Sequence, residues 1–162
     1  PMVRDADALN AVAGHPEGLG SPGGPRILTP DLGEFRRLAD PVQSDGTAAE
    51  SPSPEVQARA LAETHRIVVA LKGHRTLVTD GRRGERNMTG NPGMATGGAG
   101  DVLTGVIVAL LCQGLDAFDA ARLAVHVHGL AGDEAARQLT QVSLIASDLV
   151  RFLPDAFRVL DA

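Results

Sequence analysis

The sequence predicts a layered α/β fold with a largely parallel sheet, and three observations support this prediction. Short apolar runs that suit buried strands alternate with longer segments of helical character. The chain has 162 residues, which is enough for one domain with a sizeable core. Its composition is 43% hydrophobic and 22% charged, as in most globular proteins. We therefore expect residues 1–162 to form a single domain.

The first part of the chain is predicted to alternate between short strands, loops and a helix. Residues 1–6 fit the end of a short strand, and residues 14–25, "GHPEGLGSPGGP", have the composition of a loop. A brief buried strand is expected at 26–29. A helix is expected to follow over 30–38, because Pro30 suits a first helical turn.

The middle of the chain is predicted to hold a flexible loop, a helix and a buried strand. Residues 40–54 are polar and rich in Pro and Ser, which predicts a flexible loop. Ser53 as N-cap and Pro54 at the first position predict a helix over 55–64. The apolar run "RIVVALKG" at 66–73 is bounded by charge and glycine, as fully buried strands often are.

The remaining elements are a hairpin and three helices. The segment "TLVTDGRRGERNM" at 76–88 is typical of a hairpin that turns at Asp80–Gly81. Ser147 is expected to act as the N-cap of the last helix. The three helices are predicted at residues 101–113, 117–139 and 147–153. Only a few strands can be placed overall, which is a small number for a sheet of this class.

The composition excludes several classes of function. A net charge of −5 argues against general nucleic-acid binding, and the absence of Trp and Tyr removes the usual platforms for base stacking. No apolar stretch reaches the roughly 18 residues of a membrane span, and no signal peptide is visible, so a cytoplasmic location is expected. The lone Cys112 lies in an apolar run and is expected to be a buried structural thiol.

Residues 87–105, "NMTGNPGMATGGAGDVLTG", carry six glycines and lead into an apolar segment with helical spacing. The first turn of a helix has N–H groups without helical partners, and the helix dipole adds partial positive charge there. Because glycines lack side chains, a phosphate could approach these N–H groups closely. The stretch therefore predicts an anion-binding site at the start of a helix.

Asp101 stands at the junction between the glycines and this helix. The stretch is not a Walker A motif, because Asp101 and Val102 stand where that motif has Lys and Ser or Thr. Asp101 either caps the helix or accepts the proton of a hydroxyl that attacks a phosphoryl group. In the second interpretation, the N–H groups of Gly98, Ala99 and Gly100 would stabilise the developing charge.

The segment "TGNPGMATGGAGDVLTG" resembles the signature of the NAD(P)H-hydrate dehydratase family, which belongs to the ribokinase-like superfamily. Shorter segments resemble the same family and extend the similarity over most of the chain. They are "DADALN" at 5–10, "ILTPDLGEF" at 27–35, "LKGHRTLV" at 71–78, "HGLAGDEAA" at 128–136 and "IASDL" at 145–149. The resemblance implies a ribokinase-like α/β/α fold, here without the N-terminal strands that family members carry before "DADALN".

The resemblance also implies an activity in the repair of nicotinamide cofactors. Members of the family use ADP or ATP, with Mg²⁺ expected on the phosphates, to convert hydrated NADH or NADPH back to NADH or NADPH. Phosphorylation of the hydrate hydroxyl followed by elimination of phosphate would turn a poor leaving group into a good one. Bacterial relatives tend to be tetrameric, so a homo-oligomer is expected.

The family's site residues can be carried over onto matching positions. Asp101 would be the catalytic base and would also contact the hydrated substrate, and Gly100 would meet the nucleotide phosphate. The second nucleotide-binding segment would consist of Lys72, Gly73, His74, Arg75 and Thr76. Lys72 could pair with a phosphate there, and the alternative is that it is a solvated surface lysine.

The chain departs from the family at Asp31, where "LTP" is usually followed by a His that contacts the hydrate. With Glu34 three residues later, Asp31 is expected to cap a helix and to contact substrate only weakly. Asp5, Asp7 and Asn10 follow a strand end, where α/β sheets place ligands, although such residues also form turns. Asn10 is retained as a substrate-side residue.

Two other functions remain open at this stage. A related kinase could phosphorylate a vitamin precursor or a sugar, and a non-catalytic remnant could bind nucleotide alone or pair with a missing half. His126 and His128 are two residues apart, so on a helix they point to different faces and are expected to be structural rather than metal ligands.

Overall fold

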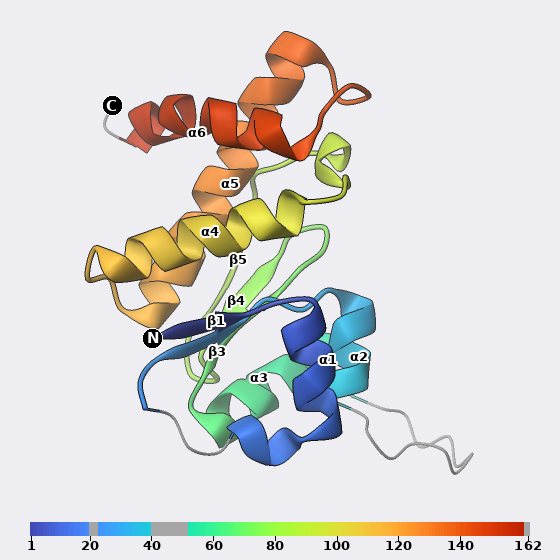
Figure 1. The fold of residues 1–162 in the computed structure, drawn as a ribbon, viewed down its shortest axis with the longest axis vertical. Coiled ribbons are helices and arrows are strands. Elements are labelled where there is room, and N and C mark those ends of the chain that lie inside the picture. The colour runs from blue at the N-terminus through green and yellow to red at the C-terminus, as the bar shows by residue number, and fades with distance from the viewer. Residues whose placement is uncertain (20–22, 40–51, 161–162) are drawn as a thin grey trace. The chain divides into compact units, whose positions relative to one another are not determined.

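The computed structural model describes residues 1–19, 23–39 and 52–160, and these form a mixed sheet, six α-helices and two short 3₁₀ helices (Figure 1). The chain divides into two compact units, Pro1–Arg86 and Asn87–Ala162. The first unit holds the whole sheet, and the second is helical in its described part. The α/β fold class is therefore confirmed.

The first unit alternates strands with helices, as the sequence predicted. Its helices are α1 (Asp7–Gly14), η1 (Pro16–Leu19), α2 (Leu32–Ala39) and α3 (Pro54–His65). Its strands are β1 (Met2–Arg4), β2 (Arg26–Leu28), β3 (Val68–Leu71), β4 (Leu77–Thr79) and β5 (Gly84–Arg86).

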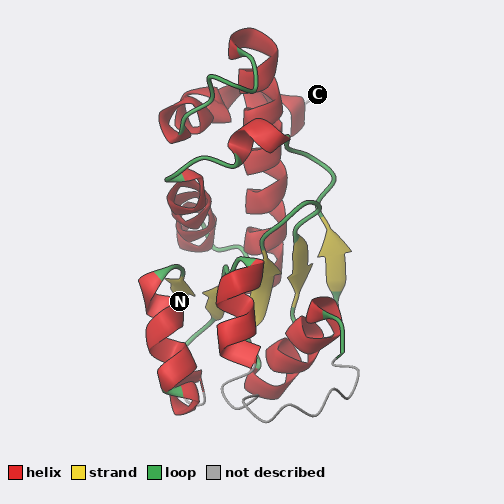
Figure 2. Ribbon diagram, turned by 90° about the vertical axis from the view of Figure 1, so that its right-hand side faces the viewer, coloured by secondary structure: helices red, strands yellow, loops and turns green. Residues whose placement is uncertain are grey.

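The five strands lie in chain order across the sheet, which is drawn in yellow in Figure 2. β1, β2 and β3 are parallel, with Val3 opposite Ile27 and Leu28 opposite Val69. β4 and β5 continue the sheet in antiparallel pairing. The antiparallel part is the predicted hairpin, in which Asp80 Oδ1 accepts the N–H groups of Arg82 and Arg83. The carboxyl ends of β1, β2 and β3 therefore lie along one edge of the sheet, where α/β proteins bind ligands.

One apolar core joins the sheet to α1, α2 and α3 in the first unit. The strands contribute Leu28, Val69 and Leu71, and β3 is buried at all four of its residues. The helices contribute Leu9 and Val12 from α1, Phe35 and Leu38 from α2, and Ala58 and Ala62 from α3. This packing fixes the helices relative to the strand ends that precede them.

The second unit is built around the long helix α5 (Ala117–Leu139). Its other elements are η2 (Pro92–Met94), α4 (Ala99–Cys112) and α6 (Ala146–Leu160). The core of this unit includes Val127, Ala131 and Ala135 from α5. Leu144, Phe152 and Ala156 pack against them, which orders α6 on α5.

Most predicted elements occur, and the differences have local causes. Ser53 caps α3 as predicted, with its Oγ accepting the N–H of Val56 at 3.4 Å. α2 begins at Leu32 rather than at Pro30, because Asp31 occupies the cap position. α1 was not predicted, and η1 occupies part of the expected loop at 14–25.

Two predictions about single residues were wrong. Cys112 is exposed rather than buried, because it is the last residue of α4 and lies off the apolar stripe of that helix. Ser147 is not the cap of the last helix, which starts at Ala146. Asp148 Oδ2 instead accepts the N–H of Ile145 at 3.0 Å. That helix also continues through Pro154 to Leu160, well beyond the predicted end.

Two further expectations concern the chain as a whole. Most of the predicted flexible loop at 40–54 lies outside the described residues, since the description stops at 39 and resumes at 52. Within the described residues, none of the helices has the length and apolar character needed to cross a membrane.

Candidate functional site

The candidate anion site begins with the glycine loop, which we define as residues 87–98. Asn91 caps the short helix η2, with its Oδ1 accepting the N–H of Gly93 at 3.0 Å. Gly98 ends the loop at the N-cap of α4 with φ of 87°, a left-handed conformation that favours glycine. A Cβ added at Gly98 would lie 3.1 Å from Cβ of Ala146, so this position disfavours any side chain.

The first turn of α4 offers backbone N–H groups to a ligand. Ala99 N–H donates to the carbonyl of Thr96 at 3.3 Å, and Val102 N–H makes the first helical bond, to Gly98 O at 3.1 Å. Within the described residues, the N–H groups of Gly98, Gly100 and Asp101 have no protein acceptor. Three donors next to the positive end of a 14-residue helix form the arrangement that binds phosphate groups.

Asp101 lies inside the first turn of α4 and is not its cap. The cap is Gly98, and no side chain donates or accepts a capping hydrogen bond there. The Asp101 side chain is exposed, and it has no hydrogen-bond or ion-pair partner among the residues that the structure describes. The interpretation of Asp101 as a simple helix cap is therefore wrong, and its carboxylate is available to accept a proton.

His128 on α5 holds the start of α4 through one hydrogen bond. Its ring is buried, and its Nε2 lies 3.0 Å from the carbonyl oxygen of Ala99. A carbonyl can only accept, so Nε2 carries the proton. Burial lowers the pKa of His128 below 6.5, which favours the neutral ring, although the bond to Ala99 acts in the opposite direction. His128 is thus a structural residue, as expected.

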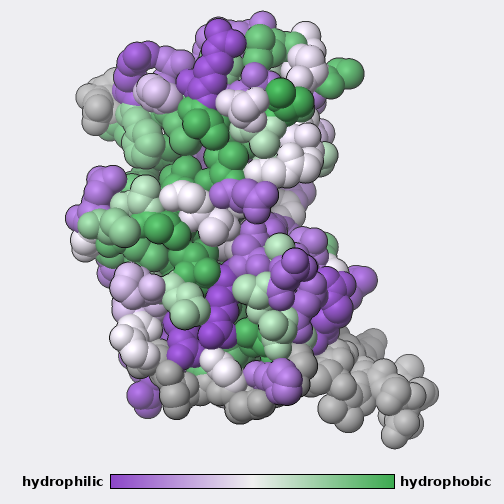
Figure 3. Space-filling model, in the orientation of Figure 1, coloured by the Kyte–Doolittle hydropathy of each residue, from purple (hydrophilic) through white to green (hydrophobic). Residues whose placement is uncertain are grey.

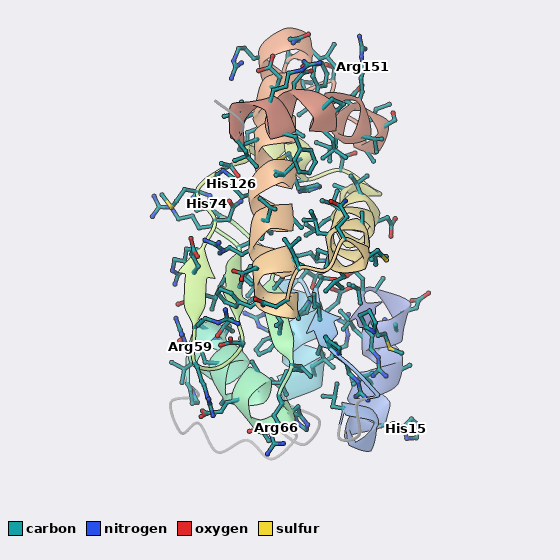
Figure 4. The ribbon with its side chains drawn as sticks, turned by 90° about the vertical axis from the view of Figure 1, so that its left-hand side faces the viewer. His15, Arg59, Arg66, His74, His126 and Arg151 are labelled. Atoms are coloured by element: carbon teal, nitrogen blue, oxygen red, sulfur yellow. The ribbon has the colours of Figure 1, made fainter. Side chains whose placement is uncertain are left out.

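His126 differs from His128 in its surroundings. It is half-buried on α5 (Figure 4), and its carbonyl oxygen accepts the hydroxyl of Thr89 at 2.8 Å. No group of three or more His, Cys, Asp or Glu side chains in the described ranges is arranged to hold a metal ion.

A second cluster lies in the first unit, at the carboxyl ends of β1, β2 and β3. Lys72 Nζ follows β3 and lies 2.7 Å from Asp5 Oδ1 and 3.7 Å from Glu34 Oε2. All three side chains are largely buried, with exposed fractions between 11% and 23%. Lys72 is therefore not the solvated surface lysine that was considered as its alternative.

Asp31 and Glu34 form a reciprocal cap at the start of α2. Asp31 Oδ1 accepts the N–H of Glu34 at 2.7 Å, and Glu34 Oε2 accepts the N–H of Asp31 at 2.7 Å. The capping role predicted for Asp31 is confirmed. Because Glu34 Oε2 also faces Lys72, the cap and the strand-end ion pairs share one carboxylate oxygen.

The other residues carried over from the family lie near this cluster in the first unit. Asn10 is exposed on α1, and its Oδ1 accepts Arg37 Nε at 3.0 Å. Gly73, His74 and Arg75 are exposed in the turn between β3 and β4, and His74 is labelled in Figure 4. The hydroxyl of Thr76 donates to the carbonyl of Gly73 at 3.2 Å and closes this turn.

A sequence model of the carbohydrate-kinase family described as NAD(P)H-hydrate dehydratase matches residues 1–155. The chain belongs to this family. It is 46% identical over 164 aligned residues to a bifunctional NAD(P)H-hydrate repair enzyme from Moorella thermoacetica, covering 99% of this chain and 30% of that protein. It is 36% identical to an ADP-dependent (S)-NAD(P)H-hydrate dehydratase from Cenarchaeum symbiosum, covering 83% of this chain and 45% of that one.

Solved structures show the same family and fold. The chain matches an ADP/ATP-dependent NAD(P)H-hydrate dehydratase from Bacillus subtilis, co-crystallised with ATP and Mg²⁺, with a TM-score of 0.77 and 32% identity. That match covers 98% of this chain and 54% of the other. A ribokinase-like superfamily protein from Enterococcus faecalis matches with a TM-score of 0.76 and 27% identity, over 96% of this chain and 51% of that one. The ribokinase-like fold is therefore confirmed, over about half the length of these relatives.

Sequence reasoning missed several residues that shape the two clusters. Asp5 and Glu34 were not predicted to bind Lys72, because residues 67 and 38 positions apart in the chain give no local signal. His128 was expected to be structural, but its bond to the start of α4 was not foreseen. The segment "HGLAGDEAA" was noted only as a family resemblance, although its spacing places several residues on one side of a helix.

Proposed function

We propose that this chain is part of an ADP- or ATP-dependent NAD(P)H-hydrate dehydratase, which converts hydrated NADH and NADPH back to NADH and NADPH. Family membership and the printed activities of its relatives support this proposal. The observation that carries it is the first turn of α4. There, the unpartnered carboxylate of Asp101 lies next to backbone N–H groups that have no acceptor within the described part of the protein.

The chemistry has two steps. Asp101 accepts the proton of the hydrate hydroxyl as its oxygen attacks the terminal phosphoryl group of the nucleotide, which releases the shortened nucleotide. In the second step the bond between ring carbon and phosphate oxygen breaks, phosphate leaves, and a neighbouring ring carbon loses a proton. The ring double bond is restored, and the net change is loss of water from the hydrate at the expense of one phosphoanhydride bond.

Backbone groups would stabilise the charge that develops during phosphoryl transfer. We assign this role to the N–H groups of Gly98 and Gly100, together with the dipole of α4. Ala99 was predicted as a third donor, and its N–H already donates to Thr96, so it would need to exchange partners. We propose that Ala99 contributes chiefly by its small size in this turn.

The residues Lys72, Gly73, His74, Arg75 and Thr76 are proposed to form a second nucleotide-binding segment, as in the family. The exposure of Gly73, His74 and Arg75 in a tight turn supports this, because such turns present backbone groups to ligands. The Lys72 ammonium lies between two carboxylates. It would bind phosphate as a point charge that is already held in place.

Mg²⁺ is proposed to accompany the nucleotide. No group of three or more acidic, His or Cys side chains in the described part of the chain forms a metal cage. This fits Mg²⁺, which keeps several waters and is usually held by one or two carboxylates and by substrate phosphates. When bound, the ion would neutralise phosphate charge. Residues of this chain would hold it mainly through the nucleotide.

The remaining assignments concern the substrate and the assembly. We propose Asp31 and Asn10 as substrate-side residues, with Asp31 a weak contact because its carboxylate caps α2 and would repel a dinucleotide phosphate. We also propose that the protein acts in the cytoplasm and that it assembles as a homo-oligomer.

The test is a recovery assay on hydrated NADH and NADPH with Mg²⁺ and either ADP or ATP. We expect the absorbance of the reduced nicotinamide to return and phosphate to be released in equal amount. Folded protein that gives no recovery with either nucleotide would contradict the proposal for this chain. A stable phosphorylated product without recovery of absorbance would instead indicate a kinase.

A further inference from the structure

One side of α5 contacts the glycine loop and the first residue of α4 at several points. Its residues are His128, Gly129, Gly132 and Asp133, which we call the α5 face. Residues three or four positions apart lie close together on one side of a helix. These four residues fall within the family segment "HGLAGDEAA", which none of the roles proposed above explains.

Asp133 supplies the main polar contact of the α5 face. Its Oδ2 accepts the N–H of Gly90 at 2.8 Å, and its Oδ1 accepts Asn91 Nδ2 at 3.0 Å. Asn91 in turn caps η2 through its own Oδ1. One carboxylate therefore holds both the backbone and a side chain of the glycine loop, and charged acceptors make the stronger hydrogen bonds.

The glycines of the α5 face bring the loop into close contact. A Cβ added at Gly129 would lie 2.7 Å from the carbonyl carbon of Thr89, and one at Gly132 would lie 2.6 Å from Cγ of Met94. Both glycines are buried inside a 23-residue helix, where each costs helix stability relative to alanine. Their place in α5 is explained by the approach of the loop and not by helix formation.

His128 makes the last contact, at the point where the loop becomes helix. Its Nε2 bond to the carbonyl of Ala99 fixes the first peptide of α4, and the N–H groups of Gly98 and Gly100 lie on either side of that residue. Together the contacts span residues 89–99, which is almost the whole path from the loop to the helix. A segment this rich in glycine would otherwise lose much backbone freedom when it binds a ligand.

We propose that Asp133 and His128 are positioning residues for the phosphate-binding start of α4, and that the α5 face pre-organises its N–H groups for the nucleotide. The inference rests on the proposed function and adds residues to that same site. Neither side chain is assigned a contact with the nucleotide. They act through Asn91, Gly90 and Ala99, whose backbone they hold in the geometry that phosphate needs.

The experiment exchanges the partners of one hydrogen bond in the 162-residue chain. Asp133→Asn places two amide groups opposite each other, and Asn91→Asp places two carboxylates opposite each other. The double variant restores the pair in reverse. The amide introduced at position 133 can donate to the carboxylate introduced at position 91, while the amide oxygen still accepts from Gly90. Asp116→Ala is the matched control, because it removes the N-cap of α5, at least 12 residues before the α5 face.

Two readouts separate positioning from general stability. Calorimetry gives the Kd for ADP and ATP with Mg²⁺, and hydrogen exchange gives the protection of amides in residues 90–101 without nucleotide. We expect Asp133→Asn to weaken nucleotide binding roughly tenfold and to speed exchange in this segment. The double variant should recover most of both, while Asp116→Ala should lower the Tm and change neither.

Three results would overturn the inference. They are wild-type exchange and affinity in Asp133→Asn, a double variant no better than Asp133→Asn, or equal effects in Asp116→Ala. If the wild-type chain binds neither nucleotide, the proposed function fails. The exchange comparison among the four variants then decides by itself whether the α5 face orders the loop.

Discussion

The two clusters of candidate site residues are held in place by different kinds of interaction. At the strand ends of the first unit, charged side chains do this, since Lys72 lies between Asp5 and Glu34 in largely buried ion pairs. In the glycine loop of the second unit, the important groups belong to the backbone, and close glycine contacts and single hydrogen bonds fix them. The first cluster depends on ion pairs between charged side chains, and the second depends on close packing and on hydrogen bonds that hold its backbone.

This difference extends to the surfaces of the two units. Most of the large exposed apolar side chains belong to the second unit, among them Val142, Ile145 and Val150, and apolar residues are prominent on the helices in the upper part of Figure 3. In the first unit the large exposed apolar side chains among the described residues are Met2, Leu32 and Val56. Because ion pairs hold the first cluster and close packing holds the second, salt should perturb the first and substitutions that add volume should perturb the second.

The largest effect is expected for Asp101→Asn, which removes the proposed base and keeps its shape. Turnover in the recovery assay should fall by about 10²- to 10⁴-fold, the usual contribution of a general base. The Kd for nucleotide should change little, because the backbone donors of the first turn remain. Equal losses in turnover and affinity would show that Asp101 serves the structure of the loop rather than proton transfer.

Adding a methyl group is expected to change the stability of the protein differently at two glycines of the second unit. Gly129→Ala should destabilise the protein by about 1–3 kcal/mol, because the new Cβ would overlap Thr89. Gly105→Ala should leave stability unchanged or raise it by up to about 1 kcal/mol, since Gly105 lies in α4 with nothing within 4 Å of the added atom. Urea denaturation measures both, and a similar loss in the two variants would contradict the close-contact argument.

Breaking the strand-end ion pair should have a smaller effect. Asp5→Asn should lower the free energy of unfolding by about 1–2 kcal/mol, between the values for exposed and buried pairs. High salt should reduce this difference in the free energy of unfolding only partly, because salt screens only the part of the ion pair that solvent reaches. Denaturation at two ionic strengths checks this, and Arg158→Gln, which breaks an exposed pair with Asp155, is the control.

The smallest effect is expected from the titration of His128. Burial lowers its pKa in the folded state, so the unfolded chain takes up the proton first as the pH falls through about 6.5. Stability from this group is therefore complete above that pH and is lost below it, by no more than about 1.4 kcal/mol per pH unit. His128→Gln keeps a donor for the carbonyl of Ala99. The free energy of unfolding of this variant, measured between pH values of about 7 and 5, should not show the loss that comes from protonation of His128.

The sequence predicted the fold class and the helix start after the glycine-rich stretch because both leave local signals. The strand at 66–73 shows as an apolar run, Ser53 and Pro54 mark a helix start, and Asp80–Gly81 marks a hairpin. The glycines before Asp101 likewise indicate a helix start that a ligand can approach. Each of these features is decided by neighbours within a few positions of the chain.

Other features depended on distant contacts and were missed or misplaced. α1 follows the short strand at once, and its polar start was interpreted as a strand end. Cys112 was predicted to be buried and is exposed, because an apolar run does not show which residue of a helix lies outside its apolar stripe. The bond from Asp133 to Gly90 spans 43 positions and has no sequence signature beyond a family resemblance.

The shared oxygen of Glu34 has a consequence for engineering this protein. Oε2 of Glu34 accepts the N–H of Asp31 and also faces the ammonium of Lys72, so residue 34 links the start of α2 to the end of β3. Replacing Asp31 with His would leave that backbone bond available. Any change at residue 34 would alter two elements at once, so engineering of this region should begin at residue 31 and leave residue 34 fixed.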